Sequence, residues 1–276
     1  MTTITHAPPA QRPANPRDVL TRAAAGPDVT GRYGTHADAL IDLYLPPGQV
    51  RRAPLVVLFH GGFWRAQYDR VHLRPLAVAL RECGFAVALP EYRRIGGAPG
   101  LEGGYPATFD DATQALHAVP TLLAEHGMTA SHTTLAGHSA GGHLVLWLAG
   151  IPSIGIDRVV ALAPVADLYA AYADHLGDDA VRGLLGGSPE SAAQRYAATD
   201  VAARLAQRPP GEIVVLHGSE DDRVPISNVR GLLVRHPWIT LHELQGTEHF
   251  ALIDPLLHAW PVVRAAMDAR RDGGHT

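Results

Sequence analysis

Gly137-His138-Ser139-Ala140-Gly141 stands between a short apolar run at residues 133–136 and a helix-like segment at 142–149. The order strand, G-x-S-x-G, helix is typical of a nucleophile elbow, a sharp turn that lifts a serine hydroxyl clear of the backbone. Glycine is favoured two positions before and after the serine, because a side chain there would collide with the neighbouring turn. The alternative is a glycine-rich turn without chemistry. We therefore predict that Ser139 is a nucleophile.

The segments on either side of this turn alternate between two hydrophobic patterns. Short continuous apolar runs predict strands buried on both faces, and longer segments with helical spacing predict helices between them. The predicted strands lie at 40–45, 55–59, 85–89, 133–136, 159–162, 213–216 and 239–244, and the predicted helices at 71–83, 109–125, 142–149, 227–235 and 256–270. This alternation predicts an α/β fold with a mostly parallel central sheet and helices on both faces.

Two segments do not follow the alternation. Residues 1–27 are rich in Pro, Ala, Arg and Thr without steady periodicity, which predicts a mobile N-terminal arm with at most a short helix at 17–25. Residues 164–211 contain helix-like pieces and no clear strand, which predicts a small helical cap inserted between two strands. We therefore expect one α/β domain over residues 28–276 with a cap insertion at about 164–211.

Length and composition exclude several classes of function. A chain of 276 residues, 46% of them hydrophobic, suits one large globular domain, and its net charge of −4 argues against nucleic acid as a partner. The single cysteine excludes an internal disulfide, and without a His-Glu-x-x-His pattern we expect no metal and no cofactor. No apolar run reaches the roughly 18 residues that span a bilayer. Residues 1–13 also lack the apolar core of a secretory signal, so we expect a cytoplasmic protein without membrane contact.

Two loops after Ser139 carry groups that could activate it. A serine hydroxyl needs a base, and the base needs a partner that fixes its tautomer and orientation. The predicted strand at 213–216 is followed by Glu220-Asp221-Asp222, and the strand at 239–244 by a turn with one histidine, His249. Loops at the carboxyl ends of parallel strands meet at one edge of a sheet, so we predict His249 as the base rather than a plain loop histidine. The order serine, acid, histidine matches the α/β-hydrolase triad, but position alone leaves the choice among the neighbouring acids open.

A third loop, His60-Gly61-Gly62-Phe63-Trp64, directly follows the predicted strand at 55–59. A tetrahedral intermediate carries negative charge on the former carbonyl oxygen, and preorganised backbone N–H groups stabilise that charge. The glycines allow the loop to fold close to the reacting carbon, and the N–H of Ala140 is the second expected donor. The alternative for residues 60–64 is a tight turn at the exit of a strand.

Together these motifs resemble the α/β-hydrolase superfamily over roughly residues 35–270. More narrowly, residues 60–64 are similar to the H-G-G-x-W signature of kynurenine formamidase (arylformamidase), a relative of the hormone-sensitive-lipase-type esterases, and residues 137–144 match the elbow of that group. The superfamily carries its acid in an H-G-x-x-D-x-x-V-P pattern, which reads His217-Gly218-Ser219-Glu220-Asp221-Asp222-Arg223-Val224-Pro225 here. The resemblance therefore implies Asp221 rather than Asp222.

The same resemblance implies roles for the loop at 60–64. It implies oxyanion-binding N–H groups at Gly62, Phe63 and Ala140, with Gly61 shaping the turn. Lipase-type relatives have a third glycine where this chain has Phe63, and the two successive aromatic residues favour a flat or apolar pocket. The residues expected to contact substrate are Gly61, Trp64, Tyr68 and Tyr92.

The expected reaction is cleavage of a small ester or amide through an acyl-enzyme on Ser139, with an N-formyl aryl amine as one candidate substrate. The expected partner is a small acyl or formyl substrate, and the expected assembly is a monomer or a homodimer. One alternative is a prolyl-oligopeptidase-type peptidase, although residues 1–27 cannot build the propeller that usually accompanies that domain. Another is a non-catalytic binding protein with the same fold, but such receptors tend to lose the base, whereas His249 is present.

Overall fold

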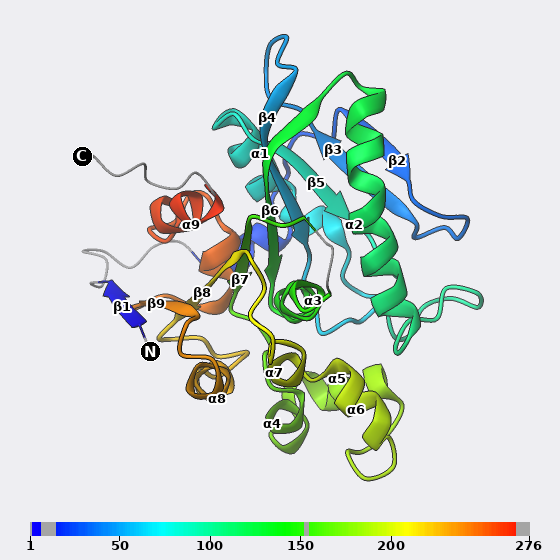
Figure 1. Ribbon diagram of the computed structural model, residues 1–276, viewed down its shortest axis with the longest axis vertical. Helices are drawn as coiled ribbons and strands as arrows, with labels where there is room; N and C mark the ends of the chain where they lie inside the picture. The colour runs from blue at the N-terminus through cyan, green and yellow to red at the C-terminus, as the bar shows by residue number, and fades with distance from the viewer. Residues whose placement is uncertain (1, 7–14, 152–154, 269–276) are drawn as a thin grey trace.

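The computed structural model describes residues 2–6, 15–151 and 155–268. Within them, nine strands form one sheet in the order β1-β9-β8-β7-β6-β4-β5-β3-β2 (Figure 1). The strands are β1 Thr2–His6, β2 Val29–Arg32, β3 Leu40–Tyr44, β4 Arg52–Phe59, β5 Ala86–Pro90, β6 Thr129–His138, β7 Arg158–Leu162, β8 Glu212–Gly218 and β9 Thr240–Leu244. Neighbours from β1 to β5 in this order pair in parallel, and β3 pairs antiparallel with both β5 and β2. The predicted mostly parallel sheet is confirmed.

The central strands are apolar throughout because both faces of the sheet are covered. In β4, Leu55, Val57 and Phe59 join one buried hydrophobic cluster, whereas Val56 and Leu58 join a second cluster. Alternate side chains of a strand point to opposite faces of its sheet. The continuous apolar run of β4 therefore fills two cores at once.

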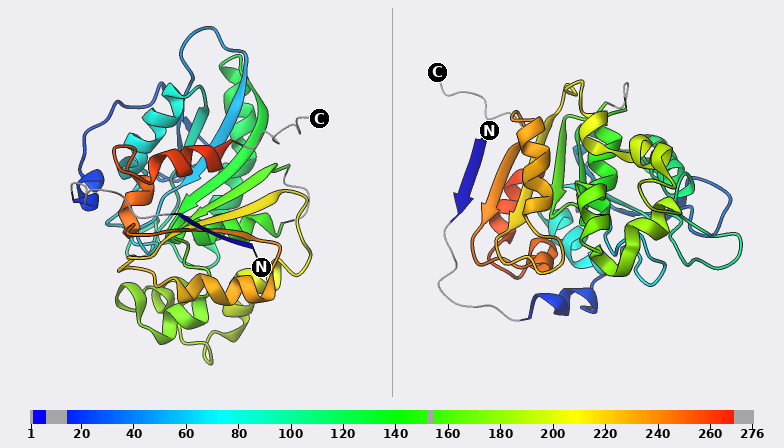
Figure 2. Two further views of the ribbon diagram at one scale, coloured as in Figure 1. Left: turned by 90° about the vertical axis from the view of Figure 1, so that its left-hand side faces the viewer. Right: turned by 90° about the horizontal axis from the view of Figure 1, so that it is seen from below.

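Helices cover both faces of the sheet (Figure 2). Helices α1 and α9 pack into the cluster that holds Val56, and α2, α3 and α8 pack into the cluster that holds Val57. The α-helices are α1 Arg74–Glu82, α2 Ala107–Glu125, α3 Ala140–Ala149, α4 Leu168–Ala173, α5 Leu176–Leu185, α6 Ala193–Thr199, α7 Val201–Arg204, α8 Ser227–Arg235 and α9 Trp260–Met267, and the 3₁₀ helices are η1 Pro16–Leu20, η2 Arg70–Leu73 and η3 His249–Ile253. No helix in the described ranges is long and apolar enough to cross a membrane.

The last predicted helix, at 256–270, differs from the observed α9 at both ends. Pro261 occupies the first turn of α9, which begins at Trp260, and residues 269–270 lie outside the described residues. Proline fixes its own φ and lacks an N–H, so it is well placed where a helix begins. The position of this proline therefore explains why α9 begins at Trp260. Residues 256–259 are not helical, so the prediction of a helix there is wrong.

The N-terminal segment contains a strand that the sequence did not reveal. β1 adds to the edge of the sheet in parallel with β9, from the pair Thr2–Thr240 to the pair His6–Leu244 (Figure 2). Its side chains are almost all exposed, so β1 has no apolar face that a pattern could detect, and backbone hydrogen bonds hold it. Residues 7–14 lie outside the described residues, and the mobility predicted for residues 1–27 stays a prediction.

The four helices α4 to α7 lie between β7 and β8 in the chain, within the segment expected to form a cap. Figure 1 shows α4, α5 and α6 grouped together at the bottom of the view, on the far side of α3 from the sheet. Tyr196 of α6 is fully buried among Tyr169 and Tyr172 of α4, with ring centroids 5.0 and 6.2 Å apart. This aromatic packing joins α4 and α6, and Tyr196 belongs to the same hydrophobic cluster as Val57 of β4.

A buried ion pair fastens the N-terminal segment to the domain, and its removal should destabilise the fold. Arg22 donates two hydrogen bonds to Asp254, whose side chain is fully buried after η3. We predict that Arg22→Ala lowers the free energy of unfolding by about 3 kcal/mol, because it leaves an uncompensated buried carboxylate. Urea unfolding measures this, with Arg264→Ala as the control, since Arg264 is exposed on α9. Equal stability of the two variants would contradict the prediction.

Candidate active site

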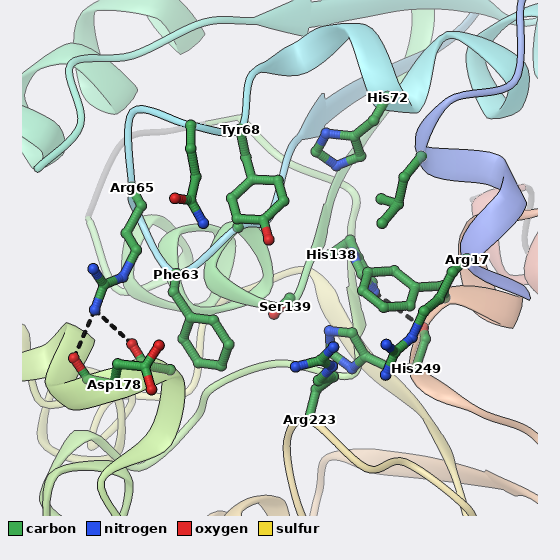
Figure 3. Close-up of a pocket in the computed structure, with 15 residues that line it drawn as sticks. Arg17, Phe63, Arg65, Tyr68, His72, His138, Ser139, Asp178, Arg223 and His249 are labelled. Atoms are coloured by element: carbon green, nitrogen blue, oxygen red, sulfur yellow. Dashed lines mark hydrogen bonds between the residues drawn. The ribbon is translucent and has the colours of Figure 1, made fainter. Parts of the chain in front are cut away.

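Ser139 lies at a strained turn between β6 and α3. Its φ of 56° and ψ of −117° place it in a region that residues other than glycine rarely adopt. A Cβ on Gly137 would lie 2.3 Å from the Gly141 carbonyl oxygen, and a Cβ on Gly141 would lie 2.3 Å from that of Phe59. Glycine is thus required at both positions, and the predicted strand, turn and helix are all present. Ser139 lines a cavity of about 320 Å³ (Figure 3).

His249 and Asp221 meet beside this turn. His249 is the first residue of η3, after β9, and its Nδ1 lies 2.7 Å from Oδ2 of Asp221, which follows β8. The second carboxylate oxygen, Oδ1, accepts hydrogen bonds from the backbone N–H groups of Arg223 and Val224 at 2.9 and 2.8 Å. With Nδ1 donating to Asp221, the Nε2 atom of His249 is left to accept a proton. His249 and Ser139 line the same cavity.

The structure shows which of the neighbouring acids, Asp221 or Asp222, contacts His249. Sequence alone left this choice open. The Asp221 side chain is fully buried, whereas that of Asp222 is 58% exposed and binds Arg17 at 2.9 Å. Burial raises the pKa of Asp221, but its hydrogen bond to His249, its electrostatic interaction with that ring and the backbone N–H of Val224 outweigh burial, so the net shift is downward. Asp221 is therefore a carboxylate at neutral pH and can hold His249 in one tautomer.

Two further histidines pack around this pair. His138 donates from Nε2 to the carbonyl oxygen of His249 at 3.1 Å, and His217 donates to the carbonyl oxygen of Val224 at 2.9 Å. Burial lowers the pKa of both rings, well below the usual value for His138, where the charge of His249 adds to the effect. Both are therefore neutral and position the backbone on either side of the His249–Asp221 pair.

The loop after β4 turns through left-handed backbone beside Ser139. Gly62, Phe63 and Trp64 have φ values of 108°, 50° and 54°, and a Cβ on Gly61 would lie 2.9 Å from that of Ser139. In the described part of the chain, no acceptor pairs with the backbone N–H groups of Gly62, Phe63 or Ala140. Ala140 also begins α3, where the helix dipole favours negative charge. The three predicted donors are thus unpaired and lie on the two loops that flank Ser139.

Buried contacts of His60 fix the position of this loop. Its Nδ1 donates to the Gly61 carbonyl oxygen at 2.8 Å and its Nε2 to Oε1 of Glu91 at 2.7 Å. Its ring stacks on Tyr92 with centroids 4.3 Å apart, and the Tyr92 hydroxyl donates to the His60 carbonyl oxygen at 2.9 Å. Because these groups are buried, the loop is fixed in place before any ligand arrives.

The predicted substrate contacts divide into two groups. Tyr68 lines the cavity, together with Gly62 and Phe63, and Figure 3 shows Phe63 and Tyr68 pointing into it on one side of Ser139. Trp64 and Tyr92 do not reach it, and both side chains are fully buried in the core. After the turn at Phe63, Trp64 points inward and packs edge-on against His143, with ring centroids 5.5 Å apart. For these two residues the prediction of substrate contact is wrong, and Gly61 lies behind Ser139 rather than in the cavity wall.

The cavity also includes residues that the sequence did not single out. They are Arg17, Leu20, Arg65, Gln67, His72, His138, Gly177, Asp178, Arg223 and Phe250. Arg17 and Leu20 come from η1, and Gly177 and Asp178 from the start of α5, where Arg65 donates to both carbonyl oxygens at 2.6 Å. These contacts join segments far apart in the chain, so no local pattern could have revealed them. Among the described residues, no group of three or more His, Cys, Asp or Glu could hold a metal ion.

The His60–Glu91 pair should make the free energy of unfolding fall as the pH is lowered. Burial raises the pKa of Glu91, but the charge and hydrogen bond of His60 and the charge of Arg94 lower it to about 2, from 4.5. A lowered carboxyl pKa stabilises the fold fully above pH 4.5, and this contribution is lost as pH falls toward 2. Urea unfolding should therefore show wild type losing about 3 kcal/mol more than Glu91→Gln between pH 5 and pH 2.

Glu125→Gln is the control for this measurement, because Glu125 is exposed at the end of α2. It should lose stability with acid as wild type does. An acid-dependent loss in Glu91→Gln as large as in wild type would contradict the assignment.

Comparisons with known proteins agree with this fold and identify a family. Over 112 residues the chain is 35% identical to carboxylesterase NlhH of Mycobacterium tuberculosis, covering 41% of this chain and 34% of that protein, so it spans about a third of the relative's length. Esterase B from Lactobacillus rhamnosis (HN001) superimposes with a TM-score of 0.75 at 19% identity over 91% of this chain and 88% of that chain. A truncated carbohydrate esterase from gut microbiota gives a TM-score of 0.73 at 17% identity over 88% and 98%. The sheet and its helices are those of an α/β-hydrolase, and since the sequence model of the BD-FAE family matches residues 41–234, the chain belongs to that family.

Proposed function

We propose that this protein is a serine carboxylesterase that cleaves small acyl esters through a covalent acyl-enzyme. One observation carries the proposal: His249, whose Nδ1 lies 2.7 Å from the buried Asp221 carboxylate, lines the same cavity as Ser139 at its strained turn. The ester-cleaving relatives and the BD-FAE family assignment support the same reaction class. Since the curated relatives are matched over only part of their length, the activity rests on the geometry of this site.

The residues have distinct roles in the proposed reaction. His249 accepts the Ser139 proton on Nε2 as the serine oxygen attacks the ester carbonyl carbon. Asp221 keeps the Nδ1 proton on His249 and stabilises the imidazolium that forms. His249 then returns the proton to the leaving alcohol. A water molecule, activated by the same histidine, hydrolyses the acyl-enzyme and frees Ser139.

The loop after β4 and the start of α3 serve the tetrahedral intermediates. The backbone N–H groups of Gly62, Phe63 and Ala140 are the donors for the negatively charged oxygen, as their lack of partners within the described residues supports. Removing one such donor costs on the order of 100-fold or more in rate. The stack of His60 on Tyr92 fixes these donors in advance, so little reorganisation is needed when charge develops.

The narrower proposal is a preference for N-formyl aryl amines. Its support is the pentapeptide at residues 60–64 and the aromatic wall formed by Phe63 and Tyr68 beside Ser139 (Figure 3). A formyl group is the smallest acyl group, and an aryl leaving group could lie against this wall. Ester cleavage does not depend on this narrower specificity.

Loss of the serine hydroxyl should abolish turnover. We predict that Ser139→Ala removes detectable hydrolysis of p-nitrophenyl acetate, because the remaining groups have no nucleophile to activate. The control is Ser131→Ala, at the opposite, exposed end of the same strand β6, which should hydrolyse the ester as wild type does. Unchanged turnover by Ser139→Ala would exclude Ser139 as the nucleophile and leave another nucleophile, whereas no turnover by wild type would leave the non-catalytic binding protein.

The two neighbouring aspartates should differ sharply. Asp221→Asn should lower kcat for p-nitrophenyl acetate by about 10⁴-fold, because an amide no longer holds the productive tautomer of His249. Asp222→Asn leaves the His249 contact intact and should retain most of the activity. Equal losses in the two variants would show that the buried contact has no special role.

The formamide preference is tested with N-formylkynurenine. An enzyme of this specificity should have a higher kcat/KM for N-formylkynurenine than for p-nitrophenyl acetate, and Ser139→Ala should lose both reactions together. Hydrolysis of the ester with no release of formate from N-formylkynurenine would remove the narrower proposal and leave the esterase.

A further inference from the structure

We propose that the substrate carries a carboxylate, and that Arg17 and Arg223 bind it at the mouth of the cavity on the His249 side of Ser139. This inference rests on the proposed function for the reaction but on separate residues for the binding. Figure 3 shows the Arg17 and Arg223 side chains pointing toward one another beside His249, with Arg65 and Phe63 on the opposite side of Ser139.

The described residues that line the cavity carry an excess of positive charge. Three are arginines, Arg17, Arg65 and Arg223, and one is an acid, Asp178. Arg65 is already committed, because it donates to the carbonyl oxygens of Gly177 and Asp178. Arg17 and Arg223 are the two cations that remain to meet a ligand.

These two arginines share one exposed carboxylate. Arg17 lies 2.9 Å from Oδ2 of Asp222, whereas Nε of Arg223 lies 3.8 Å from Oδ1, beyond hydrogen-bond distance. Within the described ranges, the Arg223 guanidinium donates no hydrogen bond. Two guanidinium groups present ten N–H donors between them and match carboxylate geometry, so one aspartate leaves both charge and donors available.

The backbone holds both arginines close to the reacting groups. The N–H of Arg223 donates to Oδ1 of Asp221, so Arg223 is tied to the acid that orients His249. The backbone N–H of Arg17 donates to the side chain of Asn15 at the start of η1, and η1 packs beside η3, which carries His249. The Arg22–Asp254 pair anchors the end of this segment. The backbone positions of both arginines are therefore set before a ligand binds.

Apolar groups accompany this charge. Leu20, on η1 with Arg17, and Phe250, on η3 next to His249, also line the cavity and could contact a short carbon chain between the ester and the carboxylate. The substrate class is thus a short ester with one apolar segment and one anionic end, on either the acyl or the alcohol side. The alternative is that Arg17 binds no substrate and only holds η1 against the domain through its ion pair with Asp222.

Paired substrates that differ only in charge test this inference. Mono-p-nitrophenyl glutarate is compared with p-nitrophenyl hexanoate for an acyl-side carboxylate, and 4-acetoxybenzoate with its methyl ester for an alcohol-side carboxylate. In at least one pair we expect wild type to have a higher kcat/KM for the anion. Arg17→Gln and Arg223→Gln should each lower kcat/KM for that anion by roughly tenfold, mainly through KM, and should lower kcat/KM for the neutral partner much less.

Arg182→Gln is the matched control, because Arg182 is exposed on α5 and outside the cavity lining, and the substitution removes the same charge. It should leave both members of each pair unchanged. The anion preference should also weaken as salt is added, since the arginines are partly exposed. No preference in either pair, or equal losses for charged and neutral esters in the arginine variants, would overturn the inference and leave Arg17 only the role of holding η1 against the domain.

A binding measurement separates this inference from the proposed reaction. Monomethyl glutarate should bind wild type and Ser139→Ala more tightly than dimethyl glutarate in calorimetry, and Arg17→Gln and Arg223→Gln should lose that difference. Selective binding without hydrolysis of any ester would overturn the esterase and keep the anion site. Hydrolysis of neutral esters without selective binding would keep the esterase and overturn the anion site.

Discussion

The close contact of β4, β6 and α3 around Ser139 constrains the geometry of the whole site. A Cβ atom at position 137 or 141 would collide with a neighbouring carbonyl oxygen. The chain can therefore turn from β6 into α3 only with glycine at both positions. Ser139 takes up the remaining turn in a sparsely populated backbone conformation that costs about 1–3 kcal/mol. The surrounding core, in which β4 and α3 are almost wholly buried, compensates for that cost. The outcome is a serine fixed at the edge of the sheet, beside the first N–H groups of a helix.

The parallel sheet explains why residues far apart in the sequence meet at this point. β4 precedes the loop at residues 60–64, and β6, β8 and β9 precede Ser139, Asp221 and His249. These parallel strands all end at the same edge of the sheet. Each strand supplies one group from its carboxyl end, so the separation of these groups along the chain has no bearing on their distance in space. The cap helices and η1 complete the cavity from outside the sheet. These added segments can therefore vary without altering the contact between His249 and Asp221.

Much of the sheet and the turn at residues 137–141 could be predicted from sequence, because both depend on local patterns. Continuous apolar runs identify β4 and β8, and glycine spacing identifies the turn at Ser139. The acid was different: only the resemblance favoured Asp221, since exposure and the contact with His249 are tertiary properties. β1 escaped detection because its side chains face solvent. The predicted substrate contacts of Trp64 and Tyr92 are wrong because aromatic residues near a site can equally well pack behind it. The neighbouring residues in the sequence do not show which way a side chain points after a left-handed turn. Arg17 and Leu20 reach the cavity through packing of η1, which no local pattern encodes.

The account depends most on the claim that Ser139 is activated by the His249–Asp221 pair for attack on an acyl carbon. The most direct measurement is reaction with diethyl p-nitrophenyl phosphate followed by peptide mass spectrometry. The account predicts one diethylphosphoryl group per chain, attached to Ser139, and slower labelling when Asp221 is replaced by Asn. Labelling at another residue, or none in correctly folded protein, would contradict it.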